Sequence, residues 1–554
     1  MCIKAIAGLL ATLAAAAAFA QVLPPPAVQP GQVERQFVPE PQPRVRSDEI
    51  QIPGPAQQLP PGNAAAIRFQ LQGITIDGVT VYDPALLAAV YADRLGREVS
   101  LSDIYAIAGE LTTRYRNDGY ILSQVIVPAQ AVEGGVIRLQ AIEGFVADIR
   151  IEGQTPMSDK VETLAAKIKT ARPLSAAVLE RYLLLMNDLP GLNAKATLMA
   201  SRALPGAAEL LIQVTERAAT GGIRLDNRGG RALGPYRLTG DLELNNRLGF
   251  DERTSVRFIT TGNRELDYLY LSQEHHVGSE GGKVSASLQA TRSRPGDAIT
   301  SLLNLETSGT SLALAYSHPL RRSRNENFYL RGSLTAHDGE SNLLDTVATR
   351  DRIRALRFGL TYDRLDAWRG INIIDLEYSQ GIKGLGASAN DDPLLSRTGG
   401  RVDFRKLTWY AGRLQALSAN WSLLAALGGQ HAFTSLLAPE LYSVGGTQFG
   451  RGYDPSELVG DHGRAFKLEL RYKGQLFGAA PATTYAFYDQ GVVRQRDGAG
   501  LAARQAAASA GLGLRMSLDR QITAVLELAQ PLTRIVAAEG NRDLRTYGGL
   551  SIRF

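Results

Sequence analysis

The chain has 554 residues, more than a single hydrophobic core usually supports, so several folding units are expected. Its 60 lysines and arginines nearly balance its 55 aspartates and glutamates, and a formal net charge of +5 without a polybasic patch does not indicate a nucleic-acid-binding protein. The single cysteine, Cys2, lies at the extreme N-terminus, so the rest of the chain has neither a disulfide nor a cysteine-based metal site.

The first 20 residues have the pattern of a secretory signal peptide. Lys4 precedes an apolar run, and Ala18 and Ala20 stand at the A-x-A spacing of a cleavage site. A transmembrane anchor is the alternative, but the run is shorter than the ~20 residues that a bilayer requires. We therefore expect residues 1–20 to be a signal peptide and the protein to be exported.

Residues 21–67 are interpreted as a proline-rich linker. Of the 25 prolines in the chain, 11 lie between Gln21 and Gly62, and this composition resists helix formation and favours extended coil. Only the stretch GQVERQF within the segment is able to form a helical turn or two. Whether a helix from this region plugs a pore is an open question at this point.

Two consecutive segments, 68–144 and 145–217, show the same order of predicted elements: strand, helix, helix, strand, strand. The helical parts have apolar residues at helical spacing, as in residues 101–115. The order repeats with a period of roughly 75 residues, which indicates an internal structural repeat. We expect two small α/β domains with these boundaries.

Residues 218–554 lack helical periodicity and contain segments of ~10 alternating residues separated by turns, the pattern of an outer-membrane barrel. In AFKLELRY, Phe466, Leu468 and Leu470 share one face, and Lys467 and Glu469 share the other. A soluble β-sandwich also alternates, but no second apolar set of strands is present to fill its core. A count of about sixteen strands predicts a membrane β-barrel with an aqueous lumen.

Four motifs resemble those of the TpsB transporters of two-partner secretion, the ShlB/FhaC/HecB family of the BamA-like superfamily. Two lie in the repeated segments, which resemble POTRA domains: DGYILSQVIVPAQAVEGGVIRLQAIEG (118–144) and LLLMNDLPGLNAKATL (183–198). In the barrel segment, GGTQFGRGYDPSELVGDHG (445–463) is similar to the GG, VRGY and GD-G run in the family's long loop after the eleventh barrel strand. AFYDQG (486–491) is similar to its F-x-D-x-G strand motif. One departure is that FG precedes the arginine where valine is usual.

The resemblance implies a membrane β-barrel of about 16 antiparallel strands in the bacterial outer membrane, preceded by two periplasmic α/β POTRA domains (β-α-α-β-β). It implies a translocator that exports an unfolded exoprotein without ATP, and the chain has no GxxxxGK[ST] motif. Neither a cofactor nor an enzymatic activity is expected, because the six histidines form no HExxH motif and no GxSxG motif is present. The alternative is an insertase of the BamA-like superfamily, although such proteins usually have more than two POTRA domains.

The resemblance also implies that the long loop, residues 429–463, folds into the barrel lumen. Arg451 then loses water and needs a partner, since leaving one member of a buried ion pair alone costs ~3 to 5 kcal/mol. Asp489 is the predicted partner, because Gly491 on the same strand face leaves room for close approach. The alternative is an ordinary turn in solvent. The predicted loop anchor comprises Arg451, Gly452, Tyr453, Phe487, Asp489 and Gly491.

A second candidate site is the open sheet edge of the first POTRA domain, to which an unfolded β-rich passenger can add a strand. We predict the edge strand at residues 120–127, with the helix at residues 101–115 lining the groove. The alternative is that these apolar residues form only the domain core. The residues expected to contact the passenger are Tyr120, Leu122, Gln124 and Ile126.

The expected partners follow from the same resemblance. The first is a cognate TpsA-type exoprotein: an adhesin, a haemolysin or a contact-dependent toxin. The second is outer-membrane lipid. The third is the barrel assembly machinery, which would recognise the aromatic C-terminal residue Phe554. Nucleic acid is not an expected partner.

Overall fold

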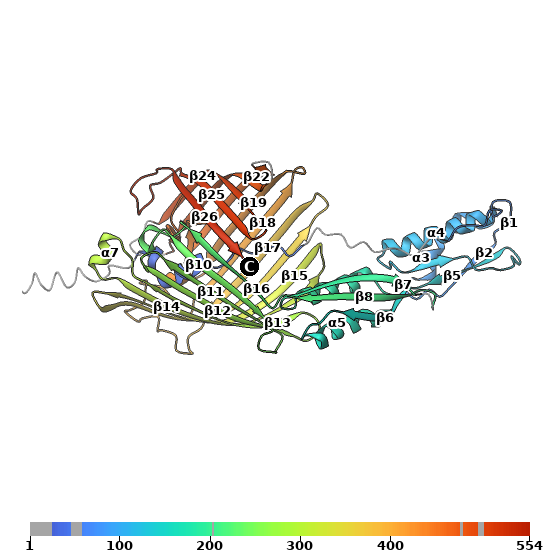
Figure 1. The fold of residues 1–554 in the computed structure, drawn as a ribbon, viewed down its shortest axis with the longest axis horizontal. Coiled ribbons are helices and arrows are strands. Elements are labelled where there is room, and N and C mark those ends of the chain that lie inside the picture. The colour runs from blue at the N-terminus through green and yellow to red at the C-terminus, as the bar shows by residue number, and fades with distance from the viewer. Residues whose placement is uncertain (1–24, 46–57, 202–203, 477–479, 497–502) are drawn as a thin grey trace, which may run out of the picture.

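The computed structural model describes residues 25–45, 58–201, 204–476, 480–496 and 503–554. These residues form a β-barrel at one end of an elongated molecule and two small α/β units that follow one another away from it (Figure 1). The expected signal peptide, residues 1–20, lies outside the described residues. Among the described residues, no helix is both long enough and apolar enough to cross a membrane.

The first α/β unit has a three-stranded sheet of order β2-β5-β4, against which helix α4 packs (Figure 1). A capping box begins α4: the Ser100 hydroxyl accepts a hydrogen bond from the Asp103 backbone N–H, and the Asp103 carboxylate accepts one from the Ser100 backbone N–H. Ile104, Ile107 and Leu111 then form the buried face of the helix. The elements are β1 (Arg68–Gln70), β2 (Gly73–Asp77), α3 (Pro84–Ala88), β3 (Glu98–Ser100), α4 (Leu101–Asn117), β4 (Gln124–Ile126) and β5 (Val136–Ile142).

The second α/β unit repeats this arrangement. Its sheet has the order β6-β8-β7, with β6 parallel and β7 antiparallel to β8, as β2 and β4 are to β5 in the first unit. Leu164 and Ile168 of α5 and Leu185 of α6 are buried in its core with Ile212 of β8. The elements are β6 (Phe145–Glu152), α5 (Ser158–Thr170), α6 (Ala176–Asn187), β7 (Leu192–Ala200) and β8 (Ala207–Glu216).

In the described part of the chain, sixteen antiparallel strands form a closed barrel, which confirms the predicted fold class. Neighbours in chain order pair with one another, and β26 pairs with β9 over residues 549–553 and 222–226 to close the ring. The strands are β9 (Ala219–Asp226), β10 (Arg237–Asn245), β11 (Glu252–Thr261), β12 (Leu266–Val277), β13 (Gly282–Ser293), β14 (Glu306–Arg322), β15 (Glu326–Leu343), β16 (Thr346–Leu365), β17 (Gly370–Gly381), β18 (Arg405–Ala416), β19 (Trp421–Ala432), β22 (His462–Leu476), β23 (Ala480–Arg494), β24 (Arg504–Ser517), β25 (Ile522–Pro531) and β26 (Arg545–Arg553).

The two faces of the barrel wall have opposite chemistry. On β22, Leu470 and Tyr472 are exposed on the outer face, whereas Lys467 and Glu469 point into the barrel and are buried. Because side chains alternate along a strand, each strand contributes one apolar face to the outside and one polar face to the lumen. A soluble protein buries its apolar face instead, so the arrangement is that of a barrel surrounded by lipid.

The second α/β unit contacts one end of the barrel through side chains on its helices. Lys160 of α5 lies 3.0 Å from Asp251, in the turn between β10 and β11. Arg181 of α6 lies 3.1 Å from Glu280, in the turn between β12 and β13. Adjacent strands are antiparallel, so every second turn lies at this same end, including residues 417–420 between β18 and β19. The opposite end therefore holds the long connection between β19 and β22.

The structure corrects the linker interpretation of residues 21–67 for residues 25–45, which run inside the barrel (Figure 1). They contain η1 (Pro26–Val28) and the helix α2 (Pro30–Gln36). Gln32 donates from its amide nitrogen to the Ala438 carbonyl at 2.7 Å, and Glu34 accepts a 2.6 Å hydrogen bond from Ser311 on the wall. Pro30 at the first helical position suits a helix start, and tertiary contacts stabilise a helix that is too short to form alone.

Candidate functional site

The connection between β19 and β22, residues 433–461, folds back into the barrel lumen. It follows the eleventh barrel strand and contains η4 (Ala438–Glu440), β20 (Tyr442–Val444) and β21 (Leu458–Gly460), of which β20 and β21 pair with each other. Val444, Phe449, Tyr453 and Leu458 are buried in one apolar cluster with Val493 of the barrel wall. This segment, the inward loop, matches the location expected for residues 429–463.

Arg451 at the tip of the inward loop contacts Asp489 on β23, as the sequence motifs predicted. The guanidinium donates through Nε to Asp489 Oδ2 and through Nη2 to Oδ1, both at 2.9 Å. The Arg451 backbone N–H donates to Oδ2 at 3.0 Å. Arg451 is 4% exposed and Asp489 is 0% exposed. This forked contact fixes both the position and the orientation of the loop tip, because a planar guanidinium meets a carboxylate in only a few ways.

Two further carboxylates surround Arg451, and sequence reasoning missed both. Its Nη1 donates to Glu469 Oε2 on β22 at 2.5 Å and lies 3.7 Å from Glu527 Oε2 on β25. The guanidinium carbon also lies 3.6 Å from the centre of the Phe487 ring, a cation–π contact. Alternation put Glu469 and Glu527 on the polar face of their strands, but only the register of the barrel brings them to the same arginine.

The other predicted anchor residues also lie at this contact. The Gly452 backbone N–H donates to Ser509 Oγ at 3.2 Å, and the Tyr453 hydroxyl donates to the Ala508 carbonyl at 3.1 Å. A β-carbon at Gly491 would lie 2.5 Å from Val444 of the inward loop, so only glycine allows the loop to approach the wall so closely. The structure thus brings all six predicted loop-anchor residues together, and their role in secretion stays a prediction.

Two other buried ionic contacts hold the inward loop. Asp461 accepts two 2.7 Å hydrogen bonds from Arg397, which lies between β17 and β18. Glu440 contacts Arg357 at 2.6 Å and Lys406 at 2.6 Å, both on the wall, and Arg35 of α2 at 3.2 Å. Helix α2 is therefore attached to the same loop that Arg451 locks to the wall.

The structure corrects part of the predicted passenger site. The edge strand β4 comprises only Gln124–Ile126, because the turn after Gly119, which has φ +91°, delays the start of the strand. Tyr120 packs against the Tyr115 ring in the core of the first unit. Leu122 packs against the core of the second unit and so belongs to the joint between the two. Gln124 and Ile126 are half-buried on an edge strand, as predicted.

A glutamine side chain already occupies the end of this edge. The Gln58 amide nitrogen donates to the Val127 carbonyl at 3.2 Å, and the Gln58 amide oxygen accepts from the Val127 backbone N–H at 2.9 Å. These two hydrogen bonds reproduce the pair that an added strand would make. Gln58 also lies with Gln124 and Gly109 in a small cavity between α4 and β4, the groove that the sequence predicted.

Comparisons with known proteins agree with this architecture. A family model described as haemolysin secretion/activation protein ShlB/FhaC/HecB matches residues 206–516. A model described as POTRA domain, ShlB-type, matches residues 69–144.

Individual relatives cover most of the chain. Heme/hemopexin transporter protein HuxB of Haemophilus influenzae (strain 86-028NP) is 24% identical over 419 residues, which cover 73% of this chain and 72% of the relative. Outer membrane transporter CdiB of Dickeya dadantii (strain 3937) is 24% identical over 424 residues, with the same coverage of 73% and 72%. The solved structure of CdiB from Escherichia coli has a TM-score of 0.73 at 19% identity and covers 90% of this chain and 94% of that chain.

Proposed function

Because this chain belongs to the ShlB/FhaC/HecB family and is a two-partner secretion transporter of the bacterial outer membrane, we propose that it recognises one unfolded exoprotein in the periplasm and exports that protein through its barrel without ATP. It is not an enzyme. The observation that carries the proposal is the content of the lumen: a loop locked to the wall and a short helix held on that loop by side-chain contacts. In this proposal α2 leaves the lumen and opens a passage for the passenger.

Recognition is assigned to the first POTRA domain. Strand β4 is at the edge of its sheet, where the backbone groups of Val125 are bonded to the Thr112 hydroxyl of α4 and those of Val127 to the Gln58 amide. In this proposal an extended chain displaces these two side chains and takes over their hydrogen bonds. An added strand gains main-chain hydrogen bonds with little dependence on sequence, which suits an unfolded, β-rich passenger. The name of one relative, hemolysin transporter protein HpmB of Proteus mirabilis, supports a haemolysin as the passenger. An adhesin or a contact-dependent toxin rests on the family resemblance alone.

The energy for transport comes from the passenger itself in this proposal. The chain has no P-loop motif, and the periplasm is not expected to supply ATP. A passenger that folds as it emerges at the cell surface loses its extended conformation and does not return through the pore. Binding of the passenger at the β4 edge has low affinity and little sequence specificity in this proposal. The passenger is therefore released readily into the pore.

The test is to delete the protein and to compare secreted and surface proteins by mass spectrometry. The proposal expects one large polypeptide to disappear while other outer-membrane proteins keep their abundance. A general depletion of outer-membrane proteins would instead support an insertase of the BamA-like superfamily. Re-expression of the wild-type protein restores the lost polypeptide in the first case.

We also propose that the barrel assembly machinery recognises Phe554. The Phe554 side chain is 67% exposed, and its backbone exchanges two 3.0 Å hydrogen bonds with Gly221 at the barrel closure. Phe554→Ala should reduce the amount of folded barrel in the membrane, measured by heat-modifiable gel mobility. Unchanged amounts of folded barrel would remove this role.

A further inference from the structure

The POTRA end of the barrel lumen holds two residues of the chain's own N-terminal segment. Arg44 and Val45 each donate a backbone N–H to Asp363 Oδ2 on β16, at 3.2 and 3.0 Å. The Arg44 guanidinium carbon lies 4.0 Å from the centre of the Tyr329 ring on β15, a cation–π contact. Asp363 and Tyr329 thus bind both the backbone and the basic side chain of one short stretch of polypeptide.

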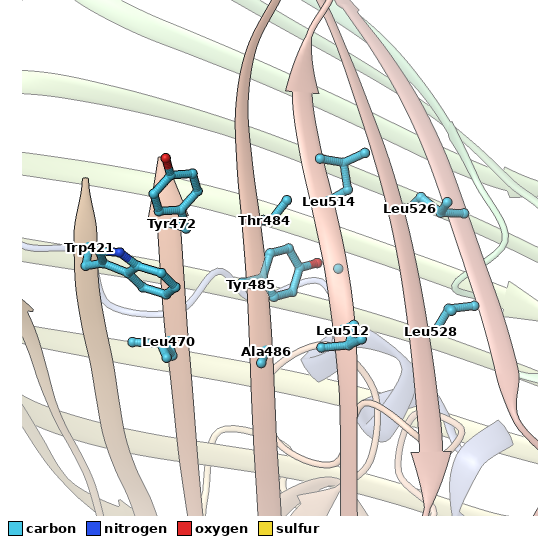
Figure 2. A pocket seen from close by; sticks show the side chains of 11 residues that line it. Trp421, Leu470, Tyr472, Thr484, Tyr485, Ala486, Leu512, Leu514, Leu526 and Leu528 are labelled. Atoms are coloured by element: carbon cyan, nitrogen blue, oxygen red, sulfur yellow. The ribbon is translucent and has the colours of Figure 1, made fainter. Parts of the chain in front are cut away.

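Asp363 faces the lumen close to the end of the barrel that the second POTRA domain contacts. It lies just before the turn at residues 366–369, which is one of the turns at that end. Its side chain has the same direction as that of Arg357, which contacts the inward loop inside the barrel. The outer face of the wall is apolar instead, as Leu470 and Leu512 show (Figure 2). A polypeptide that comes from the POTRA domains therefore reaches Asp363 before it reaches the inward loop.

Asp363 has more acceptor capacity than the segment uses. It is 0% exposed, and its Oδ2 accepts a third hydrogen bond, from Asn327 Nδ2 at 2.9 Å. Its Oδ1 is buried and has no hydrogen-bond partner among the described residues. A buried carboxylate is costly unless hydrogen bonds or a cation compensate its charge. This group is thus suited to accept further N–H donors or to attract a basic side chain.

The contacts made by the segment are ones that almost any unfolded chain can make. Residues 39–45 form neither helix nor strand, and three of the first five are prolines. Proline and the residue before it both avoid the helical conformation, so this stretch is extended. Both hydrogen bonds to Asp363 come from backbone N–H groups, which every residue except proline supplies. A lysine or arginine adds the contact with the Tyr329 ring.

We propose that Asp363 and Tyr329 form the entry site of the pore for an unfolded polypeptide that carries a basic side chain. The inference rests on the proposed function, because that polypeptide is the passenger. Arg44 and Val45 fill the entry site while α2 is in the lumen, and the passenger takes their place when α2 leaves. The competing explanation is a tether, in which Asp363 and Tyr329 bind only the chain's own segment.

The first experiment measures binding of a peptide probe by disulfide formation. Arg44→Ala with Val45→Pro removes the native contacts with the entry site, and Thr361→Cys supplies a thiol in the lumen cavity that Tyr329 also lines. Cys2, the single native cysteine, is replaced by serine. The probe is an unfolded glycine–serine peptide with one arginine next to one cysteine. Under mild oxidation it should react with the folded, detergent-solubilised protein several-fold faster than the same peptide with alanine in place of arginine.

Two further variants show whether the reaction depends on the entry site. Ser551→Cys is the matched control, because Ser551 pairs with the lumen-facing Arg224 at the same end of the barrel, eight strands away from β16. It should react slowly and equally with both peptides. Adding Asp363→Ala to Thr361→Cys should slow the reaction about tenfold, because hydrogen bonds to a charged group are the stronger ones. Equal rates at positions 361 and 551, or equal rates for the two peptides at position 361, would overturn the inference even if Asp363→Ala failed to fold.

The second experiment separates an entry site from a tether in the otherwise native chain. Asp363→Ala removes the entry site, whereas Arg44→Ala with Val45→Pro only empties it. Both changes loosen the segment and should lengthen the open periods in planar bilayers, but only Asp363→Ala should slow secretion of the polypeptide that is lost on deletion. Heat-modifiable mobility checks folding. Longer open periods with normal secretion in Asp363→Ala would show a tether and overturn the inference, whereas a wild-type protein that secretes no polypeptide would overturn the proposed function itself.

Discussion

At the residue scale, Arg451 is the group on which the position of the inward loop depends. Its removal leaves Asp489 buried in the lumen wall without its cation, whereas Glu469 keeps its contacts with Arg471 and Arg515. A buried charge that loses its partner costs ~3 to 5 kcal/mol, and the loop can avoid this cost by moving so that water reaches the Asp489 carboxylate. The loop tip then no longer has one defined position.

We therefore expect Arg451→Ala and Asp489→Ala to abolish secretion of the passenger while the barrel still inserts. Arg451→Lys should restore only part of the activity, because an ammonium group does not make the forked contact. Secretion is measured by the amount of passenger in the medium, and insertion by heat-modifiable mobility. Arg464→Ala, on the outer face of β22, is the control and should secrete normally. Normal secretion by both alanine variants at the anchor would contradict the role.

Gln58 is the second residue for which the structure predicts the effect of a substitution, here on the affinity for the passenger. Its amide occupies the backbone groups of Val127 that an incoming strand would use. Because each such hydrogen bond contributes ~0.5–1.5 kcal/mol, Gln58→Ala should tighten passenger binding by about tenfold. Fluorescence anisotropy of a labelled N-terminal passenger fragment with the full-length protein measures this. Gln70→Ala, whose amide contacts the Gly96 carbonyl, is the control and should leave the affinity unchanged.

At the element scale, α2 closes the lumen through its fit against the inward loop. A β-carbon at Gly31 would lie 2.3 Å from the Pro439 β-carbon, so the helix seats only with glycine at this position. We expect Gly31→Val to displace α2 and to give more continuous conductance in planar bilayers. Pro439→Gly in the same chain removes the opposing side-chain atoms but leaves the backbone α-carbon 2.8 Å away, so it should restore the closed periods in part. Wild-type conductance in Gly31→Val would contradict the plug assignment.

At the scale of the whole molecule, the second POTRA domain is oriented by charged contacts with the barrel. Asp188, at the end of α6, accepts hydrogen bonds from Arg322 at 2.8 and 2.9 Å. Burial opposes the charge of Asp188, but the hydrogen bonds and charge of Arg322 outweigh this effect, so the pKa of Asp188 lies below its usual value. A lowered carboxyl pKa means that the docked state is stabilised when the carboxylate is ionised.

The stabilisation by Asp188 is fully present above the ordinary carboxyl pKa of ~3.9 and is lost as pH falls through the lowered value. We expect the distance between spin labels on the POTRA domain and the barrel rim to be narrowly distributed at neutral pH and to broaden in acid. Asp188→Asn should be broad at neutral pH and should respond less to acid. A wild-type distribution in this variant would show that Lys160 and Arg181 suffice.

How much of the structure could be predicted from the sequence differs between single residues, secondary-structure elements and the whole molecule. Alternation along each strand predicted the barrel and the faces of its residues, and the repeated element order predicted two POTRA-like units. The Arg451–Asp489 contact was predictable because both residues lie in recognisable motifs. Glu469 and Glu527 were not, since strand alternation does not give the register between strands. The sequence indicated that the stretch GQVERQF is able to form a turn or two of helix, but its place in the lumen was not predictable, because proline content says nothing of the contacts that a lumen supplies.

The sequence by itself determined which residues face lipid, which face the lumen and how many strands and modules the chain forms, because these depend on local periodicity. Only the tertiary structure decided which charges share a site, where residues 25–45 lie and that Leu122 belongs to a joint between domains. The physical reason is that such contacts join residues hundreds of positions apart. The energies of these contacts depend on closure of the barrel around them. A local sequence pattern carries no information about that closure.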